Sequence, residues 1–365
     1  MENKLQTSEW VSPGHPDKVA DIISEYILDR IIEMDPKARY AVECQIKDNI
    51  VTLAGEATSG VLVTEEKLNE WVSNALFNIG YTEQYKKHFG KKNTIGCKNI
   101  KVEHHIGMQS PDIAQGVNKD GWGDQGIFFG MWCGETESGF TKDYDLARRI
   151  GQKLYQLASL TENGLGIDIK TQVTWDDTER QVDQVIVAIP TMEDKNLDKV
   201  TKDLKKFIRK EFPETRGAKF VINGTGAYHV HGPIGDSGTT GRKLVVDFYG
   251  SGSRIGGGSP WTKDPTKADL TLNLFARELA KLAFFHWREE IPDIHKVETE
   301  VSCCIGKPDI ICTTTAYDPD GIPLHRVSEK RKVKPSFLIK RYNLDKPNYT
   351  KMCMEGLFSQ SDLLR

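Results

Sequence analysis

Residues 232–269 read GPIGDSGTTGRKLVVDFYGSGSRIGGGSPWTKDPTKAD, and they are the most informative stretch of this chain. They include nine glycines, five basic residues and four aspartates. Glycine lets backbone N–H groups approach a ligand, lysine and arginine neutralise phosphate oxygens, and carboxylates hold Mg²⁺ together with phosphates. The alternative is a long polar loop without a ligand. A phosphate site is the better interpretation if a second region has the same chemistry.

Such a region is Gly14-His-Pro-Asp-Lys-Val-Ala-Asp21. Apolar residues after it recur at helical spacing until Asp35-Pro36, and Pro16 suits the first helical position. His15 would then cap the helix, with an aspartate and a lysine in its first turn. A helix N-terminus favours anions, so we expect this one to bind phosphate, although a histidine there can also be a simple cap.

Composition limits the other classes of function. The chain has 365 residues, which is long enough for two or three hydrophobic cores. Its 49 basic and 52 acidic side chains give a net charge of −3, so no overall electrostatic field attracts nucleic acid. No apolar stretch approaches a membrane span, and the N-terminus lacks a signal-peptide core. The seven cysteines are scattered without a Cys-x-x-Cys pair, which predicts a reduced, cytoplasmic protein and does not favour zinc.

Hydrophobic patterns predict three units of strands and a helix, and in the first two a strand hairpin is followed by a helix and a further strand. The first such unit has strands at 40–46 and 50–57, a helix at 68–79 and a strand at 98–106. The second has strands at 167–175 and 181–189, a helix at 196–212 and a strand at 220–222. A third, less clear unit has a strand at 243–249, a helix at 267–285 and strands at 296–304 and 310–316. We therefore predict an α+β fold with antiparallel sheets.

Two common nucleotide motifs do not fit their expected context. Gly121–Gly126 matches G-x-G-x-x-G, but the apolar residues after it predict a strand where a dinucleotide fingerprint needs a helix. Gly235–Lys243 has a spacing unlike that of a P-loop, has arginine in place of its lysine, and precedes the strand expected at 243–249. Neither motif is retained.

The motifs together resemble the S-adenosylmethionine synthetase (methionine adenosyltransferase) family. The likeness is carried by Gly14–Asp21, Gly123-Asp-Gln-Gly126 and Gly232–Lys243, and supported by Gly55-Glu56, Gln109–Ile113, Asp168–Val173 and Lys263–Asp269. They occur in the family's order and cover roughly the first 310 residues.

The resemblance implies three similar interleaved sheet-and-helix domains in a pseudo-threefold arrangement, with sheets that pair across a dimer interface. The expected division is residues 14–112 with about 262–270, residues 1–13 with 135–231, and residues 113–134 with 232–261 and 271–365. It also implies a homodimer with active sites between subunits, with pairing into a dimer of dimers left open.

The implied activity makes S-adenosylmethionine from ATP and L-methionine by displacing triphosphate at C5′, then hydrolyses tripolyphosphate to diphosphate and phosphate. A thioether needs no base to attack carbon, so the barrier lies in stabilising a highly charged leaving group, for which positioned cations are suited. By resemblance the catalytic residues are His15, Lys170, Arg242, Lys243, Lys263 and Lys267. Those that bind ATP or methionine are Glu56, Gln109, Asp124, Asp168, Asp236 and Ser259. Asp17 and Asp269 would bind two Mg²⁺ ions per site, and Glu43 one K⁺.

The chain departs from the family pattern at four places. A segment GGGAFSGKD in the family is Gly256–Asp264 here, with Ser259, Pro260, Trp261 and Thr262 replacing its middle. An expected Arg-Phe pair is Ala227-Tyr228, the segment 115–123 is several residues shorter, and the C-terminus is trimmed. These changes leave two alternatives open: adenosyl transfer to another thioether or mainly tripolyphosphate hydrolysis, and a non-catalytic regulatory subunit.

Overall fold

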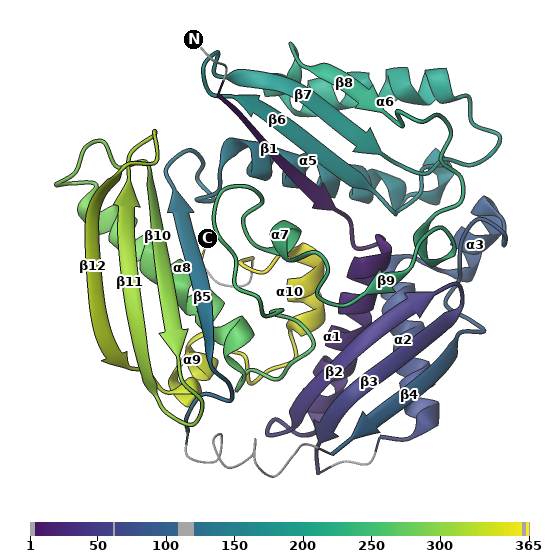
Figure 1. Ribbon diagram of the computed structural model, residues 1–365. Helices are drawn as coiled ribbons and strands as arrows, with labels where there is room; N and C mark the ends of the chain where they lie inside the picture. Colours follow the sequence, from purple (N-terminus) through teal and green to yellow (C-terminus); the bar gives the residue numbers. More distant parts are fainter. Residues whose placement is uncertain (1–3, 61–62, 109–119, 360–362, 365) are drawn as a thin grey trace.

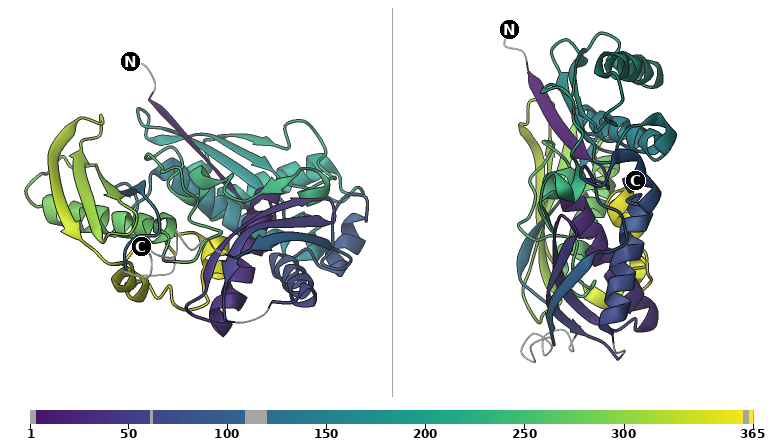
Figure 2. Two further views of the ribbon diagram at one scale, coloured as in Figure 1. Left: turned by 60° about the horizontal axis from the view of Figure 1, so that its bottom comes forward. Right: turned by 90° about the vertical axis from the view of Figure 1, so that its right-hand side faces the viewer.

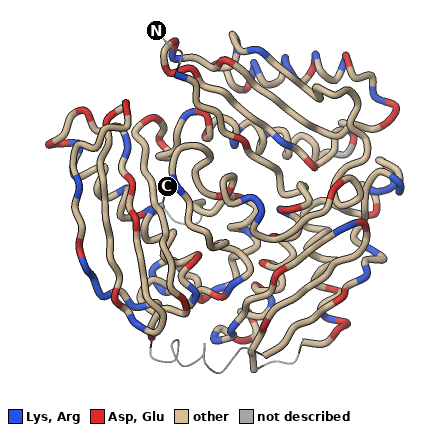
Figure 3. The backbone as a smooth tube through the Cα atoms, in the orientation of Figure 1, with Lys and Arg blue, Asp and Glu red and all other residues tan. Residues whose placement is uncertain are grey.

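Three four-stranded sheets and their helices form the molecule in a computed structural model that describes residues 4–60, 63–108, 120–359 and 363–364 (Figure 1). The strands of all three sheets lie toward one side, and most helices lie on the other (Figure 2, right). Basic and acidic residues are mixed over all three sheets (Figure 3), as the small net charge predicts. Among the described residues, no helix is long and apolar enough to cross a membrane.

The first sheet has the order β4-β3-β2-β9. Its strands are β2 (Arg39–Lys47), β3 (Ile50–Thr58), β4 (Lys101–Gly107) and β9 (Gly238–Thr239), and its helices are α1 (Pro16–Met34), α2 (Glu65–Ile79) and α3 (Glu83–Phe89). On β2, Tyr40, Val42, Cys44 and Ile46 are buried, and the residues between them are exposed or half-buried. This alternation confirms the predicted half-buried strand and places the core beneath it, where α1 contacts β2.

The second sheet has the order β1-β6-β7-β8. Its elements are β1 (Leu5–Val11), β6 (Lys170–Asp176), β7 (Gln181–Ala188), β8 (Lys219–Ile222), α5 (Lys142–Ala158), α6 (Leu197–Glu211) and the short turns Thr161–Asn163 and Pro213–Thr215. The first strand of the chain thus pairs with a strand about 165 residues later, Leu5 opposite Asp176. Distant segments of the chain complete one sheet.

The third sheet has the order β12-β11-β10-β5. Its elements are β5 (Gly126–Cys133), β10 (Lys296–Cys303), β11 (Asp309–Tyr317), β12 (Pro323–Lys332), α8 (Ala268–Trp287) and α9 (Pro335–Arg341), and α8 packs on β5 and β10. The last helix, α10 (Tyr349–Glu355), contacts α1 near the centre of the molecule (Figure 1).

The predicted α+β class is confirmed, but not all neighbouring strands are antiparallel as predicted. Most neighbouring strands are antiparallel, but β3–β4 and β7–β8 are parallel. In both cases a helix lies between the two strands in sequence, and such a crossover returns the chain in the same direction. The expected domain boundaries remain a prediction.

The prediction of a strand at 243–249 is wrong. Residues Leu244–Asp247 form a one-turn helix, α7, and Gly250 follows with a φ of 58°. Short apolar runs do not distinguish strand from helix by periodicity, and here Asp247 is drawn into a buried ion pair with Lys18. Because α7 and not a strand follows Gly235–Lys243, one of the three arguments against a P-loop there fails. The other two, the irregular glycine spacing and the arginine in place of lysine, still hold.

Candidate functional site

His15 occupies the N-cap of α1, as the sequence predicts, with extended backbone angles of −65° and 136°. The N–H of Asp17 donates to its Nδ1 over 3.2 Å. The ring proton of a neutral imidazole in this arrangement is carried by Nε2. Burial, followed by the nearby Lys243 ammonium, lowers the pKa of His15 to about 3. His15 is therefore a neutral donor through Nε2.

The Asp17 carboxylate is held by one backbone N–H and two cations. It accepts a hydrogen bond from the N–H of Thr239 at 3.0 Å and from Lys243 Nζ at 2.5 Å, and Arg242 Nε lies 3.7 Å away. Burial would raise its pKa, but Lys243 and the Thr239 N–H outweigh burial and lower it. Strand β9 can lie this close to α1 because residue 238 is glycine: a Cβ there would lie 1.9 Å from the carbonyl oxygen of Pro16.

Lys18 does not join the phosphate site, contrary to expectation. It is buried, with Nζ 2.7 Å from Asp247 Oδ1 and 3.1 Å from Asp21 Oδ2. Asp247 also accepts from the indole N–H of Trp261 at 2.8 Å, and Asp21 accepts from the N–H of Gly241 at 2.9 Å. Because Gly241 precedes Arg242 and Lys243, this buried network fixes the turn that carries both cations.

Asp168 forms a second anchor close to His15. It is buried and accepts hydrogen bonds from Tyr228 Oη at 2.7 Å and from the N–H of Gly232 at 2.8 Å. Burial raises its pKa to about 6. Lys170 and Asp236 act electrostatically on both Asp168 and His15, so these side chains share one region at the ends of α1 and β6.

Another cluster lies at the start of α8. Lys263 Nζ is 2.8 Å from Asp269 Oδ2, whereas Lys267 Nζ contacts Asp264 Oδ2 at 3.1 Å and the Tyr40 carbonyl at 3.2 Å. Asp264 has no exposed surface and its carboxylate accepts four hydrogen bonds, so it supports the loop. A Cβ on Gly258 would lie 1.6 Å from Asp269 Oδ1, so the glycine backbone lies directly against this carboxylate.

Glu43 connects the two regions on β2. One of its carboxylate oxygens accepts a hydrogen bond from the Thr240 hydroxyl, and the other accepts from Thr262 Oγ1 at 3.1 Å. The carboxylate is thus oriented by threonines from the loops that precede Lys243 and Lys263. In the described part of the chain, no hydrogen bond or ion pair joins the His15 region directly to the Lys263 cluster.

The remaining expected residues are less constrained. Asp124 is exposed just before β5, and its Oδ1 accepts from the N–H of Gln125 at 2.7 Å. Glu56 is half-buried on β3 opposite Ala41, and Ser259 Oγ accepts from the N–H of Trp261 at 3.2 Å. Gln109 lies outside the described residues, as does most of the shortened segment 115–123.

Two of the four departures from the family pattern, at 256–264 and at Ala227-Tyr228, are explained by contacts in the structure. Trp261 is fully buried and supports Asp247, so its ring faces the interior. Thr262 stands where the family pattern has glycine and adopts a φ of 72°, a conformation that glycine adopts without strain. Its N–H donates to the buried Glu25 at 2.5 Å. Tyr228 carries the hydroxyl that binds Asp168. These contacts could not be found from sequence spacing.

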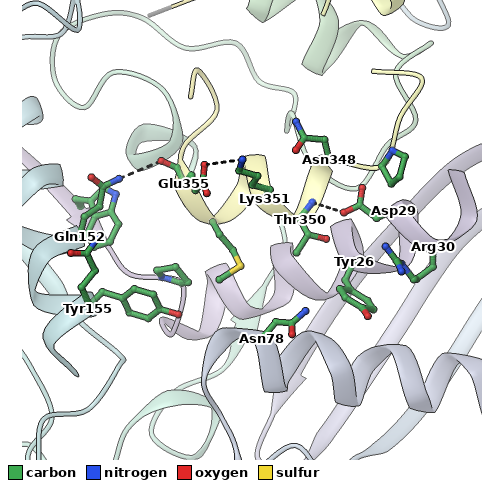
Figure 4. Close-up of a pocket in the computed structure, with 15 residues that line it drawn as sticks. Tyr26, Asp29, Arg30, Asn78, Gln152, Tyr155, Asn348, Thr350, Lys351 and Glu355 are labelled. Carbon is green, nitrogen blue, oxygen red and sulfur yellow. Dashed lines mark hydrogen bonds and ion pairs between the residues drawn. The ribbon is translucent and has the colours of Figure 1, made fainter. Parts of the chain in front are cut away.

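A cavity of about 870 Å³ lies away from all of these residues (Figure 4). It is bordered by Tyr26 and Arg30 of α1, Asn78 of α2, Tyr155 of α5 and Lys351 of α10. None of the expected site residues that the structure describes lines it. Volume therefore does not identify the site here; the clustered charges at the ends of α1 and α8 do.

Comparisons with known proteins agree along the whole chain. Three family models match: the N-terminal domain of S-adenosylmethionine synthetase over residues 3–111, the central domain over 119–228 and the C-terminal domain over 230–364. Proteins described as S-adenosylmethionine synthase from Syntrophobacter fumaroxidans and Myxococcus xanthus are 34% and 35% identical to it. The alignments cover 99% and 98% of this chain, and 94% and 90% of those proteins.

The structure of this chain also resembles that of a solved protein. A solved S-adenosylmethionine synthetase from Campylobacter jejuni superposes with a TM-score of 0.83 at 29% identity, over 98% of this chain and 95% of that one. The agreement extends across all three sheets, because the alignment spans nearly the complete length of both chains.

Proposed function

This chain belongs to the S-adenosylmethionine synthetase family, whose enzymes are methionine adenosyltransferases, and from that premise we propose how its residues act. In the proposed reaction the sulfur of L-methionine attacks C5′ of ATP, and the C5′–O bond breaks to release triphosphate. The bound tripolyphosphate is then hydrolysed to diphosphate and phosphate. The observation that supports this most directly is the meeting of neutral His15, Asp17 and Lys243 at the N-terminus of α1.

Charge on the leaving group is the main demand of this reaction. Methionine sulfur has no proton to lose, so no general base is required, whereas triphosphate gains charge as it departs. Lys243, Arg242 and Lys170 supply cations beside His15, and the helix N-terminus adds its dipole. Neutral His15 can donate a hydrogen bond from its Nε2–H to the leaving oxygen at C5′ while the proton stays on the ring.

The family's Mg²⁺ and K⁺ fit the carboxylates present. Asp17 and Asp269 form salt bridges with Lys243 and Lys263, the lysines that face the triphosphate in this proposal, so each carboxylate would hold Mg²⁺ beside phosphate oxygens. Glu43, oriented by two threonine hydroxyls, is the proposed K⁺ residue. Bound Mg²⁺ would neutralise phosphate charge. The residues of this chain orient the phosphates around it.

The second cluster is assigned to the opposite side of the substrates. We assign Lys263 and Lys267 to the triphosphate, Glu56, Gln109 and Asp124 to methionine, and Asp168, Asp236 and Ser259 to the nucleoside or its surroundings. A homodimer with active sites between its subunits, as the family resemblance implies, would let residues of both chains reach one ATP. The three sheets present a common side for such pairing (Figure 2).

No contact among the described residues favours either alternative function, the other adenosyl transfer or tripolyphosphate hydrolysis on the one hand and the regulatory subunit on the other. Trp261 and Thr262 are buried supports, and the charged residues that bind phosphates in the proposal are all present. Seven cysteines without disulfides agree with the cytoplasm as the proposed location.

One assay tests the proposal. The protein is incubated with ATP, L-methionine, Mg²⁺ and K⁺, and the nucleoside product and phosphates are identified by mass and by ³¹P NMR. We expect S-adenosylmethionine with equal amounts of phosphate and diphosphate. Released tripolyphosphate would contradict the hydrolysis step alone. Phosphates without a sulfonium product would contradict adenosyl transfer, and a Lys243→Met variant is the matched control for contaminating activity.

A further inference from the structure

Cys133, Glu135 and His295 bring three different metal-binding groups together outside the proposed active site. One donor atom from each lies within 4.8 Å of the others. Cys133 Sγ is 3.8 Å from His295 Nε2, and the same nitrogen is 2.9 Å from Glu135 Oε1. We propose that these residues bind a zinc ion through one thiolate, one imidazole and one carboxylate, with water in the fourth position.

The backbone holds the three residues in place. Cys133 ends β5 and pairs with Lys296 at the start of β10, the N–H of Gly134 donates to the His295 carbonyl at 2.9 Å, and the His295 N–H donates to the Tyr317 carbonyl at 2.8 Å. Glu135 lies two residues after Cys133, in the turn that follows β5, and the Gly134–His295 hydrogen bond keeps this turn beside the start of β10. The site is therefore attached to the ladder of the third sheet.

The separations suit a tetrahedral ion. Sulfur at about 2.3 Å and nitrogen at about 2.05 Å from one Zn²⁺ lie about 3.5 Å apart, and nitrogen and oxygen ligands lie about 3.3 Å apart. The observed 3.8 and 2.9 Å differ from these separations by less than about 0.5 Å, within reach of side-chain rotation. Glu135 Oε2 accepts from the N–H of Lys142 at 2.8 Å, a contact that orients the carboxylate from outside the site.

Access and ligand type point to the same ion. Cys133 is fully buried, whereas His295 and Glu135 line an open cavity of about 470 Å³ through which an ion and a water molecule can enter. A thiolate selects zinc over magnesium, which prefers oxygen ligands. The site lies at the far end of β5 from Asp124, about 23 Å along an eight-residue strand, so it is separate from the proposed phosphate chemistry.

Cobalt substitution tests the site directly. Chelator-stripped protein at pH 8 is titrated with Co²⁺ in excess Mg²⁺, because burial raises the pKa of Cys133 to about 12 and the metal must displace its proton. We expect one equivalent of Co²⁺ to produce a thiolate-to-cobalt charge-transfer band and tetrahedral visible bands, and Zn²⁺ to remove both. Absence of the charge-transfer band in the wild-type protein would overturn the proposal.

Matched variants identify the sulfur. Cys133→Ser should abolish the band, whereas Cys312→Ser, a buried cysteine of the same sheet, and the exposed Cys304→Ser should retain it. A band that persists in Cys133→Ser or disappears in Cys304→Ser would place the metal elsewhere. If Cys133→Ser does not fold, Glu135→Gln and His295→Asn should each weaken Zn²⁺ affinity by about 100-fold or more. If the Zn²⁺ affinity is unchanged in both variants, the cluster is an ion pair between Glu135 and His295 beside a buried thiol and not a metal site.

Discussion

The ammonium of Lys18 lies 2.7 Å from a carboxylate oxygen of Asp247, and both side chains are almost completely buried. The pair joins the first turn of α1 to α7, and Asp21 and Trp261 complete its hydrogen bonds. It lies beneath the turn that presents Arg242 and Lys243 to Asp17. A buried ion pair thus supports the turn that carries exposed Arg242 and half-buried Lys243.

Removing one partner of this pair should destabilise the protein strongly. Asp247→Ala removes the nearer of the two carboxylates that contact Lys18 and also the acceptor of the Trp261 N–H, and we expect the free energy of unfolding to fall by about 3–5 kcal/mol. Urea unfolding measures the change. The matched control is Glu33→Ala, which breaks the exposed Arg30–Glu33 pair and should change stability by less than about 1 kcal/mol. Equal effects in the two variants would show that burial of the Lys18 pair has no special role.

Two lysines near α8 should respond differently to the same substitution. Lys263 is paired with half-buried Asp269, so Lys263→Met should lower kcat by about 10²-fold or more with a smaller change in ATP affinity. Lys267 compensates fully buried Asp264, so Lys267→Met should lower both stability and activity. Steady-state kinetics and urea unfolding separate the two effects. An unchanged kcat in Lys263→Met would remove that residue from the proposed transition state.

His15 should remain neutral at physiological pH. Its pKa, lowered to about 3 by burial and by Lys243, lies below the ordinary 6.5, so the unfolded chain binds more protons than the folded one between these values. The stability that His15 contributes is complete above about pH 6.5 and is lost as the pH falls toward 3. Nitrogen NMR of the ring should show the Nε2–H tautomer without titration between about pH 5 and 8. A titration midpoint near 6.5 would contradict this electrostatic assignment.

Local patterns predicted the elements around the site better than the contacts within it. The helix after Pro16 and the β2–β3 hairpin are confirmed because each has a clear apolar period and a clear end. The segment 243–249 was misassigned because its conformation depends on Lys18, more than two hundred residues away. The Cys133–His295 contact likewise depends on β5–β10 pairing, which no cysteine spacing reveals.

Asp168 should titrate well above an ordinary aspartate. Burial raises its pKa from 3.8 to about 6, so its contribution to stability is complete below about pH 3.8 and is lost as the pH rises through 6. The Tyr228 hydroxyl stabilises the charged carboxylate, and Tyr228→Phe should therefore raise the pKa further. Carbon NMR of labelled aspartate measures both midpoints. A wild-type midpoint near 4, or a lower one in Tyr228→Phe, would contradict the assigned contact.

Sharing of the active site between subunits can be measured by mixing two inactive variants. His15→Ala affects the α1 region, and Asp124→Ala affects the residue before β5. If one site takes His15 from one subunit and Asp124 from its partner, each heterodimer contains one intact site. Random exchange makes about half of the dimers mixed, so about a quarter of wild-type activity should return.

The two variants must be unfolded and refolded together, because an obligate dimer exchanges subunits slowly once assembled. Each variant refolded alone is the control for residual activity, and sedimentation of the mixture confirms that dimers have formed. No recovery in a fully dimeric mixture would place His15 and Asp124 in the same subunit's contribution. A fully active monomer would refute the shared site altogether, because every residue of the site would then come from one chain.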